Sequence, residues 1–187
     1  MQAIYLITTG GTIEKTYSER TGKLLNLAPK IGPYLAQMRL PHTRITIVPL
    51  IAKDSVELTA EDRGKLCSAV RRRLAALCPI VITHGTDTMV ETALDLARCL
   101  GEVPVPIIFT GAFAPLGFEN SDGMQNLAEA LLAAKLLMSG IYLVIHNEVF
   151  DIRAVRKDRQ ARTFVRVAGA RRYPKAVGRS PRRPRQP

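Results

Sequence analysis

The chain has 187 residues, a length that suits one folded domain and leaves little room for two. Hydrophobic residues make up 47% of it, and because tryptophan is absent and aromatic residues are few, the core is expected to be aliphatic. No apolar run approaches the roughly 20 residues that a membrane-spanning helix needs, which excludes a helical membrane protein. The net charge is +11, but eight basic residues and no acid lie in residues 166–187, which leaves only +3 for residues 1–165.

Apolar runs alternate with helical patterns along the chain. In chain order these are a run at 3–8, a weaker helical pattern at 31–39, a run at 44–51, a helix at 59–77, a run at 79–83, a helix at 88–100, a run at 105–110, a helix at 123–138 and a run at 141–146. The runs are near-continuous in Ile, Val and Leu, which is typical of strands buried on both faces. Strands that alternate with helices predict an α/β fold: a doubly wound, mostly parallel sheet flanked by helices, in a single domain.

The ends of these helices carry recognisable signals. Thr59 is a predicted N-cap, and Thr88 with Glu91 has the spacing of a capping box. Ser121 or Asp122 is expected to cap the last helix. That helix is predicted to pack through one apolar face, formed by Met124, Leu127, Leu131, Leu132 and Met138.

The C-terminal segment 166–187 is rich in arginine and proline, and we expect it to form a disordered basic tail behind a catalytic domain of residues 1–165. Such a tail could touch nucleic acid. We favour a solvated end without that partner, because Tyr173 is the only aromatic residue among the charges.

Two features bear on the compartment. The cysteines, Cys67, Cys78 and Cys99, are odd in number and form no CxxC pair, so we expect free buried thiols in a reducing compartment. Residues 1–7 lack the basic segment and the cleavage site of a signal peptide. A cytoplasmic location without a membrane partner is therefore the expectation.

Segment 8–14, with the letters TTGGTIE, directly follows the first predicted strand. It places Thr12 on a tight glycine turn, where a hydroxyl can act as a nucleophile once a neighbouring group takes its proton. A purely structural turn or a phosphate-binding loop are the alternatives. Neither GxGxxG nor GxxxxGK[ST] occurs, so a nucleotide is less favoured and no cofactor is expected.

Segment 83–88, with the letters THGTDT, follows another predicted strand and precedes a helix. Asp87 could bind a cationic group and Thr86 could act as a second hydroxyl, while backbone N–H groups at the helix start could stabilise an oxyanion. Equally, Asp87 or Thr88 could merely cap the helix. Because the carboxyl ends of parallel strands meet at one edge of a sheet, we expect Thr12 and Thr86 to converge there.

Other candidates are less distinctive. Ser55 follows a predicted strand and could hold a carboxylate, although it could equally be a turn residue. Lys157 is one of several basic residues in its segment, so position alone does not single it out. The histidines, His42, His84 and His146, show no metal-ligand spacing, and no metal site is expected.

Four motifs in this order resemble the bacterial L-asparaginase family. They are TGGTI at 9–13, HGTDT at 84–88, TGA at 110–112 with NSDGxxNL at 120–127, and DxRxVxK at 151–157. Together they are far more specific than any one alone, and the resemblance covers roughly residues 1–165. It implies hydrolysis of L-asparagine to aspartate and ammonia, with some glutaminase activity.

The resemblance also implies roles for individual residues. Thr12 would attack the side-chain amide carbon to give an acyl-enzyme, which water would then hydrolyse. Lys157 would help Thr86 as a base, Asp87 would bind the α-amino group of the substrate and Ser55 its α-carboxylate. A tyrosine that assists the first threonine is matched best by Tyr17. The substrate site would further include Gly11, Gly85 and Ala112.

The chain also departs from the family. Typical members are roughly twice this length and complete the site with a second domain across a subunit interface. Val56 stands after Ser55 where the family often has glutamine, so one contact to the α-amino group is missing. We therefore expect a homo-oligomer, a dimer or a tetramer, that covers the face which a second domain would bury.

Two other functions stay open. The asparaginase-like subunit of a tRNA-dependent amidotransferase resembles the same family, and the basic tail slightly favours it, although such subunits usually carry an extra N-terminal domain. A catalytically weak, truncated homologue could instead act as a binding protein, with its tail on RNA. The presence of all five predicted site residues argues against this last reading.

Overall fold

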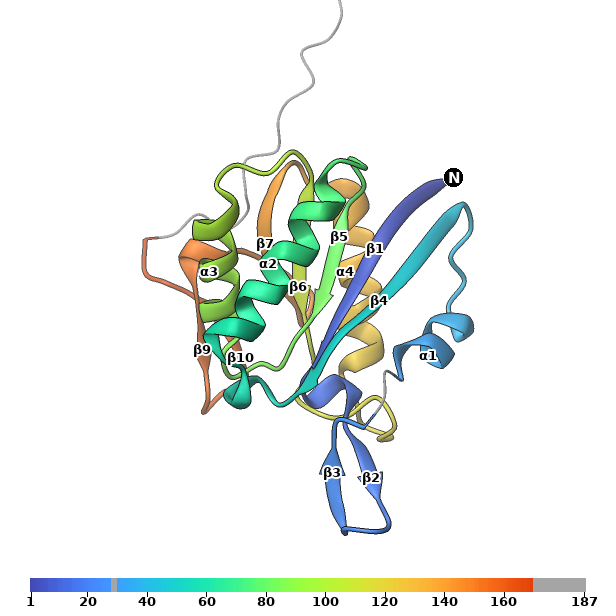
Figure 1. The fold of residues 1–187 in the computed structure, drawn as a ribbon. Helices are drawn as coiled ribbons and strands as arrows, with labels where there is room; N and C mark the ends of the chain where they lie inside the picture. The colour runs from blue at the N-terminus through green and yellow to red at the C-terminus, as the bar shows by residue number, and fades with distance from the viewer. Residues whose placement is uncertain (28–29, 170–187) are drawn as a thin grey trace, which may run out of the picture.

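A computed structural model of the chain describes residues 1–27 and 30–169. Its centre is a six-stranded sheet whose first five strands run parallel, while the sixth is antiparallel to its neighbour (Figure 1). In order across the sheet, the strands are β4 (Thr43–Lys53), β1 (Gln2–Gly10), β5 (Ile80–Thr83), β6 (Pro106–Thr110), β7 (Gly140–Ile145) and β8 (Glu148–Asp151). The predicted doubly wound, mostly parallel α/β fold is confirmed.

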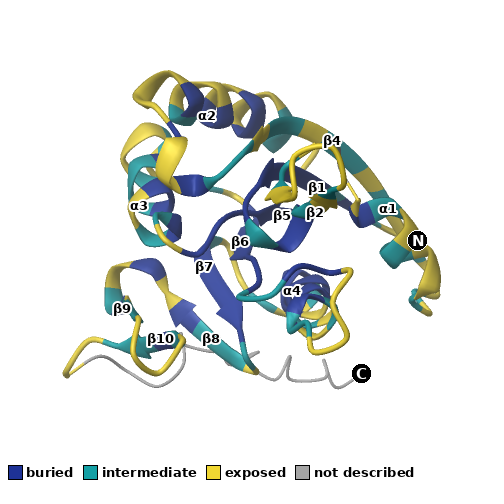
Figure 2. Cartoon of the chain, turned by 90° about the horizontal axis from the view of Figure 1, so that it is seen from below, coloured by how far each residue is buried: buried dark blue, intermediate teal, exposed yellow. Residues whose placement is uncertain are grey.

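Helices cover both faces of the sheet. They are α1 (Ile31–Gln37), α2 (Ala60–Leu74), α3 (Met89–Leu100) and α4 (Gly123–Leu136). Along β1, Ile7 joins a core cluster with α2 and α3, whereas the adjacent Leu6 joins a second cluster with α1 and α4. Successive side chains of a strand point to opposite faces, so the two clusters are the two layers of one sandwich. Figure 2 shows the central strands buried and the outer sides of the helices exposed.

Short hairpins and single turns complete the fold, and none of them was predicted. One hairpin, β2 (Thr16–Ser18) with β3 (Lys23–Leu25), projects from the body, and the other, β9 (Val155–Asp158) with β10 (Thr163–Arg166), lies beside α3 (Figure 1). The single-turn 3-10 helices are η1 (Thr12–Glu14), η2 (Ser55–Glu57) and η3 (Ile152–Ala154).

The predicted helix ends hold in part. Thr59 caps α2 in a full capping box with Asp62. The predicted capping box of α3 is wrong: the Thr88 side chain makes no cap and donates instead to the carbonyl oxygen of Ser55 at 2.8 Å. At α4 the Ser121 hydroxyl accepts a hydrogen bond from the backbone of Gly123.

One predicted packing face is also partly wrong. Leu127 and Leu131 of α4 are buried, but Leu132 is 57% exposed and Met138 is 52% exposed. Leu132 follows Leu131 by one residue, a turn of about 100° that carries it off the buried stripe, while Met138 lies beyond the end of the helix.

The cysteine prediction is wrong as well. Cys67 of α2 and Cys99 of α3 form a disulfide, with their Cα atoms 6.5 Å apart, and Cys78 alone remains a free thiol. The two helices pack side by side on one face of the sheet, which brings together cysteines 32 residues apart. Sequence spacing gave no sign of this pairing.

The remaining predictions about the ends and the membrane have limited outcomes. Of the predicted tail, Arg166 ends β10, and residues 170–187 lie outside the described part of the chain. Within the described residues, no helix is both long enough and apolar enough to cross a bilayer.

Candidate active site

The strand order places a reversal at β1. Its neighbours are β4 on one side and β5 on the other, so the chain leaves β1 in one direction and later returns to its opposite edge. In open α/β sheets, ligands bind outside the carboxyl ends of the strands at such a point. Thr12 follows β1, Ser55 follows β4 and Thr86 follows β5. The fold therefore brings three predicted site residues to the edge that favours a ligand.

Close backbone contact joins the loops that follow β1, β4 and β5. Gly11 has a φ of +76°, and a Cβ added to it would collide with the backbone of Gly85. A Cβ added to Gly85 would lie 2.5 Å from the Ser55 hydroxyl. Only glycine permits this approach, and it holds the neighbouring Thr12 and Thr86 on the same edge of the sheet.

Side chains reinforce the same contact. Thr88 donates to the backbone of Ser55, and Lys15 forms a 2.6 Å ion pair with Asp54, which ties the loop after β1 to the loop after β4. Burial acts to raise the pKa of Asp54, but hydrogen bonds from Lys15 and from the backbone of Val56 outweigh it and hold that pKa below its ordinary value.

Lys157 reaches this edge from β9. Its Nζ donates to the Thr86 hydroxyl at 2.7 Å and to Asp87 Oδ1 at 3.0 Å, and it lies 4.9 Å from the ring centroid of Phe113. Arg159 reaches the same carboxylate oxygen at 2.8 Å. The Lys157 side chain is only 15% exposed, so the hairpin holds it against Thr86 rather than in solvent. Among the basic residues of its segment, tertiary contact singles Lys157 out.

The predicted residues differ in their access to a ligand. Thr12 is half-buried, and the Asp87 carboxylate is 34% exposed, so both can meet a molecule from solvent. Thr86 is buried, and so is Ser55. The Ser55 hydroxyl has no hydrogen-bond partner within the described residues. Buried polar groups are normally paired, so this hydroxyl is a free donor at the site.

A further carboxyl group beneath the first loop escaped the sequence reasoning. Glu14 is 3% exposed and accepts a hydrogen bond from the backbone of Gly10 at 3.2 Å. Burial raises the pKa of Glu14 to about 7, against the opposing effect of that hydrogen bond. The only signal was an acid two residues after Thr12, at a place where no partner was predicted.

His84 is the other buried titratable group of this region. Burial lowers its pKa to about 4, so the ring is neutral at ordinary pH. Its Nδ1 lies 2.8 Å from the carbonyl oxygen of Gly85. Because a carbonyl only accepts, Nδ1 carries the proton, and the ring braces the loop between Gly85 and the strand before it.

The structure keeps two predicted residues apart from this edge. Tyr17 lies on the projecting hairpin, 59% exposed. Ala112 is wholly buried in the cluster of α4, so it offers no surface to a ligand. A cavity of about 620 Å³ contains none of the predicted residues; Gly101, Glu102 and Arg153 are among those that line it. No group of three His, Cys, Asp or Glu residues suited to a metal ion occurs in the part of the chain that the structure describes.

Comparison with known proteins supplies the family. Residues 3–166 match the family model described as asparaginase, N-terminal. The chain belongs to the asparaginase family. The predicted resemblance is thereby confirmed.

The relatives share less than half of their own length with this chain. An L-asparaginase of Thermococcus kodakarensis is 30% identical over 146 residues, which are 78% of this chain and 44% of the relative. L-asparaginase 1 of Escherichia coli K12 is 32% identical over 156 residues, or 80% and 45%. A subunit of the glutamyl-tRNA(Gln) amidotransferase of Methanococcus vannielii is 44% identical over 171 residues, or 81% and 36%.

Solved structures show the same partial match. The thermostable L-asparaginase of T. kodakarensis superposes with a TM-score of 0.81 at 28% identity, covering 89% of this chain and 51% of that one. L-asparaginase I of Vibrio cholerae gives 0.77 at 28% identity, covering 88% and 51%. The chain thus corresponds to about half of these asparaginases.

Proposed function

We propose that the chain is an amidohydrolase that cleaves the side-chain amide of L-asparagine, through a threonine nucleophile and an acyl-enzyme, to aspartate and ammonia. The observation that carries this proposal is the contact of Lys157 with Thr86 and Asp87, at 2.7 and 3.0 Å, on the edge of the sheet that Thr12 also occupies. A hydroxyl, a potential base and a carboxylate that orients it form the arrangement that an activated nucleophile needs.

In this proposal each group has one task. Thr12 attacks the amide carbon, and ammonia leaves. Water then attacks the acyl-enzyme, with Lys157 in its neutral form moving a proton through the Thr86 hydroxyl. Asp87 binds the α-ammonium group of the substrate, and the unpaired Ser55 hydroxyl donates to its α-carboxylate.

Supporting roles are proposed for three further groups. The backbones of Gly11 and Gly85, which pack against each other, line the substrate. Tyr17 assists Thr12 from the β2–β3 hairpin, which requires this hairpin to close over the site. Small residual glutaminase activity follows if the pocket admits one more methylene group.

The assembly and location are proposals too. The chain spans less than half of the curated relatives that it matches, and the α4 side chains of Leu132 and Leu136 are 57% and 70% exposed. We propose a cytoplasmic homo-oligomer, a dimer or a tetramer, in which such apolar surface is covered. Sedimentation at micromolar concentration tests the assembly, and a monomer throughout would contradict it.

Ammonia release from L-asparagine and from L-glutamine tests the function. Wild type is compared with Thr12→Ala and Thr86→Ala, and with Thr43→Val as a matched control at the opposite end of the sheet, where the Thr43 hydroxyl accepts a hydrogen bond from Lys135. We expect both site variants to lose nearly all activity and the control to keep it. Wild type that releases no ammonia from either amide would reject the proposal.

A second candidate function is the ammonia-producing subunit of a tRNA-dependent amidotransferase. It is favoured by the 44% identity to the amidotransferase subunit of M. vannielii. Here the same site would hydrolyse the amide, and the ammonia would pass to a partner subunit. Affinity purification of the chain at native expression, followed by mass spectrometry and RNA sequencing, decides it: a second subunit and bound tRNA favour this function, whereas their absence favours the free amidohydrolase.

A further inference from the structure

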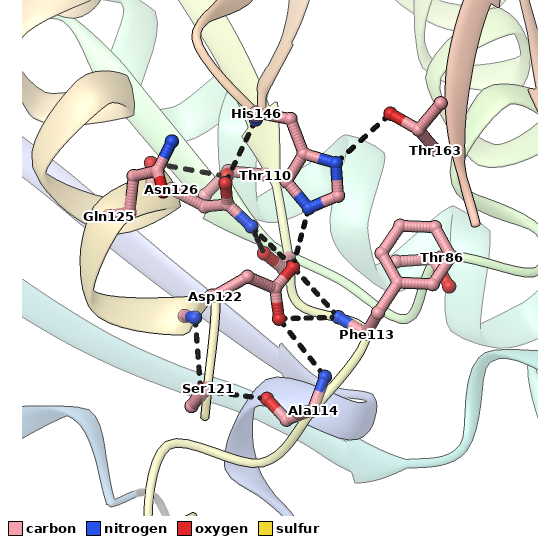
Figure 3. Close-up of polar contacts among 12 residues, drawn as sticks. Thr86, Thr110, Phe113, Ala114, Ser121, Asp122, Gln125, Asn126, His146 and Thr163 are labelled. Atoms are coloured by element: carbon pink, nitrogen blue, oxygen red, sulfur yellow. Dashed lines mark hydrogen bonds and ion pairs between the residues drawn. The ribbon is translucent and has the colours of Figure 1, made fainter. Parts of the chain in front are cut away.

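A polar network lies directly behind the site, centred on Asp122 (Figure 3). The Asp122 carboxylate accepts hydrogen bonds from the backbone N–H groups of Phe113 at 2.9 Å and Ala114 at 3.0 Å, and from Asn126 Nδ2 at 2.9 Å. Burial acts to raise the pKa of Asp122, but the amide groups and His146 lower it further, so the carboxylate stays ionised. None of the site roles proposed above uses this carboxylate.

His146 connects the Asp122 carboxylate to the β9–β10 hairpin. Its Nε2 lies 2.9 Å from Asp122 Oδ2, and its Nδ1 lies 3.0 Å from the Thr163 hydroxyl. An ionised carboxylate only accepts, so Nε2 carries a proton, and in the neutral ring Nδ1 accepts from Thr163. One imidazole thus bridges the start of α4 and strand β10 from the end of β7.

The backbone of His146 is fixed as firmly as its ring. Its φ is +50°, in a tight turn between β7 and β8, and its N–H donates to Asn126 Oδ1 at 2.9 Å. A non-glycine residue in this conformation is uncommon and persists where its surroundings hold it. The ring therefore projects from an anchored turn and cannot follow a moving hairpin.

The hairpin end of this bridge leads to Lys157. Thr163 and Phe164 of β10 pair with Asp158 and Lys157 of β9, so the residue that His146 holds is diagonal to the lysine. A second path runs through Phe113, whose ring lies 5.5 Å from the His146 ring and 4.9 Å from Lys157 Nζ. Both paths end on the amine that donates to Thr86.

We propose that His146 is a positioning residue for Lys157: bridged between Asp122 and Thr163, it fixes the β9–β10 hairpin so that the lysine amine stays against Thr86. The inference rests on the proposed function for its catalytic consequence, but its structural consequence can be measured without any substrate. A histidine suits this task because a single ring offers one donor and one acceptor on opposite sides, together with a flat face for Phe113.

The experiment uses the full chain and removes one end of the bridge at a time. Thr163→Val deletes only the hydroxyl, Thr163→Ser restores it, and His146→Phe keeps a ring against Phe113 without either hydrogen bond. Thr43→Val is the matched control, since it removes a hydrogen-bonded hydroxyl far from the hairpin.

Two readouts are compared. The first is the rate at which acetic anhydride labels Lys157, measured by peptide mass spectrometry relative to the exposed Lys65. The second is the pair kcat and KM for L-asparagine. We expect Thr163→Val and His146→Phe to speed the labelling of Lys157 severalfold and to lower kcat by about tenfold, since misplacing a reacting group by an ångström is costly, with KM changed less than about twofold. Thr163→Ser should return both readouts toward wild type.

The outcomes separate the two proposals. If wild type hydrolyses no amide while the labelling of Lys157 still rises in Thr163→Val, the proposed function fails and the positioning role stands. If labelling and kcat in Thr163→Val equal those of Thr43→Val, His146 does not position Lys157, whatever the activity. A fall in kcat without faster labelling, or without rescue by Thr163→Ser, also overturns the inference. Thr163→Val keeps the test decisive if His146→Phe fails to fold.

Discussion

The Nζ atom of Lys157 lies 2.7 Å from the hydroxyl of Thr86, although the two residues are 71 positions apart in the chain. Thr86 follows a central strand of the sheet, and Lys157 comes from a separate hairpin, so the contact exists only because the hairpin docks beside α3. This relationship is the structural basis of the amidohydrolase proposal.

Replacing Lys157 should abolish the proposed reaction. Lys157→Met removes the amine, and we expect kcat to fall at least about a hundredfold, the size of a general acid–base contribution. Lys157→Arg should fail almost as badly, because a guanidinium keeps its proton at any ordinary pH. Ammonia release measures both variants, and Lys65→Met, in an exposed ion pair with Glu61, is the control. Full activity in Lys157→Arg would show that Lys157 is not the base.

Adding a methyl group to Gly11 should destabilise the fold. Its Cβ would strike the backbone of Gly85, and its φ is positive, so we expect Gly11→Ala to lower the free energy of unfolding by more than about 3 kcal/mol. Urea denaturation followed by circular dichroism measures this.

Two glycine controls separate the clash from the backbone effect. Gly22 has a φ of +65° with only a 4.0 Å neighbour, so Gly22→Ala should cost about 1 kcal/mol from φ alone. Gly64 lies within α2 with nothing near its Cβ position, so Gly64→Ala should stabilise by about 0.5–1 kcal/mol. A Gly11→Ala variant no less stable than Gly22→Ala would mean that the two loops do not touch.

The buried Glu14 should make stability depend on pH. Its pKa rises from 4.5 to about 7 on folding, so between these values the folded state keeps a proton that the unfolded state has lost. Stability from this group is therefore present at low pH and is lost as pH rises through about 7, by about 3 kcal/mol in all. His84 acts in the opposite sense, because its pKa falls from 6.5 to about 4.

Glu14→Gln isolates the first of these effects. The variant has no proton to lose, so its free energy of unfolding minus that of wild type should grow by about 2–3 kcal/mol between pH 5 and pH 8. Urea titrations at several pH values give this difference, from which the His84 contribution cancels. A constant difference across the range would contradict a raised pKa for Glu14.

The pairing of Cys67 with Cys99 should be visible in a thiol count. Unfolded without reductant, the protein should react with Ellman's reagent at Cys78 alone, and at all three cysteines after reduction. The bond closes a loop of 32 residues, so Cys67→Ser with Cys99→Ser should lower the free energy of unfolding by about 3–4 kcal/mol on the loop-entropy account. Three reactive thiols before reduction would exclude the bond in the purified protein.

Much of the fold was predictable from the sequence, because each central element satisfies its own local rule. The runs at 79–83 and 105–110 became β5 and β6 with shifts of one residue, since a strand buried on both faces must be apolar throughout. The hairpins β2–β3 and β9–β10 were missed because their strands are short and half-polar, with no buried face to impose a pattern.

The site divides in the same way. Thr12, Ser55 and Thr86 could be placed because each directly follows a recognisable strand, and parallel strands end at one edge. Lys157 could be selected only by resemblance, and neither Glu14 nor His146 was selected as part of the site. The pKa of Glu14 and the bridging role of His146 depend on burial and on partners brought from elsewhere in the chain, and local sequence does not encode them.

By itself, the sequence determined the alternation of strands and helices, the glycine turns and the hydroxyls that follow them, because each depends on neighbours a few residues away. Only the tertiary structure decided which lysine meets Thr86, which cysteines pair and which carboxyl is sealed from water. Those outcomes depend on how helices and hairpins dock, and docking joins residues whose separation along the chain carries no information about their distance in space.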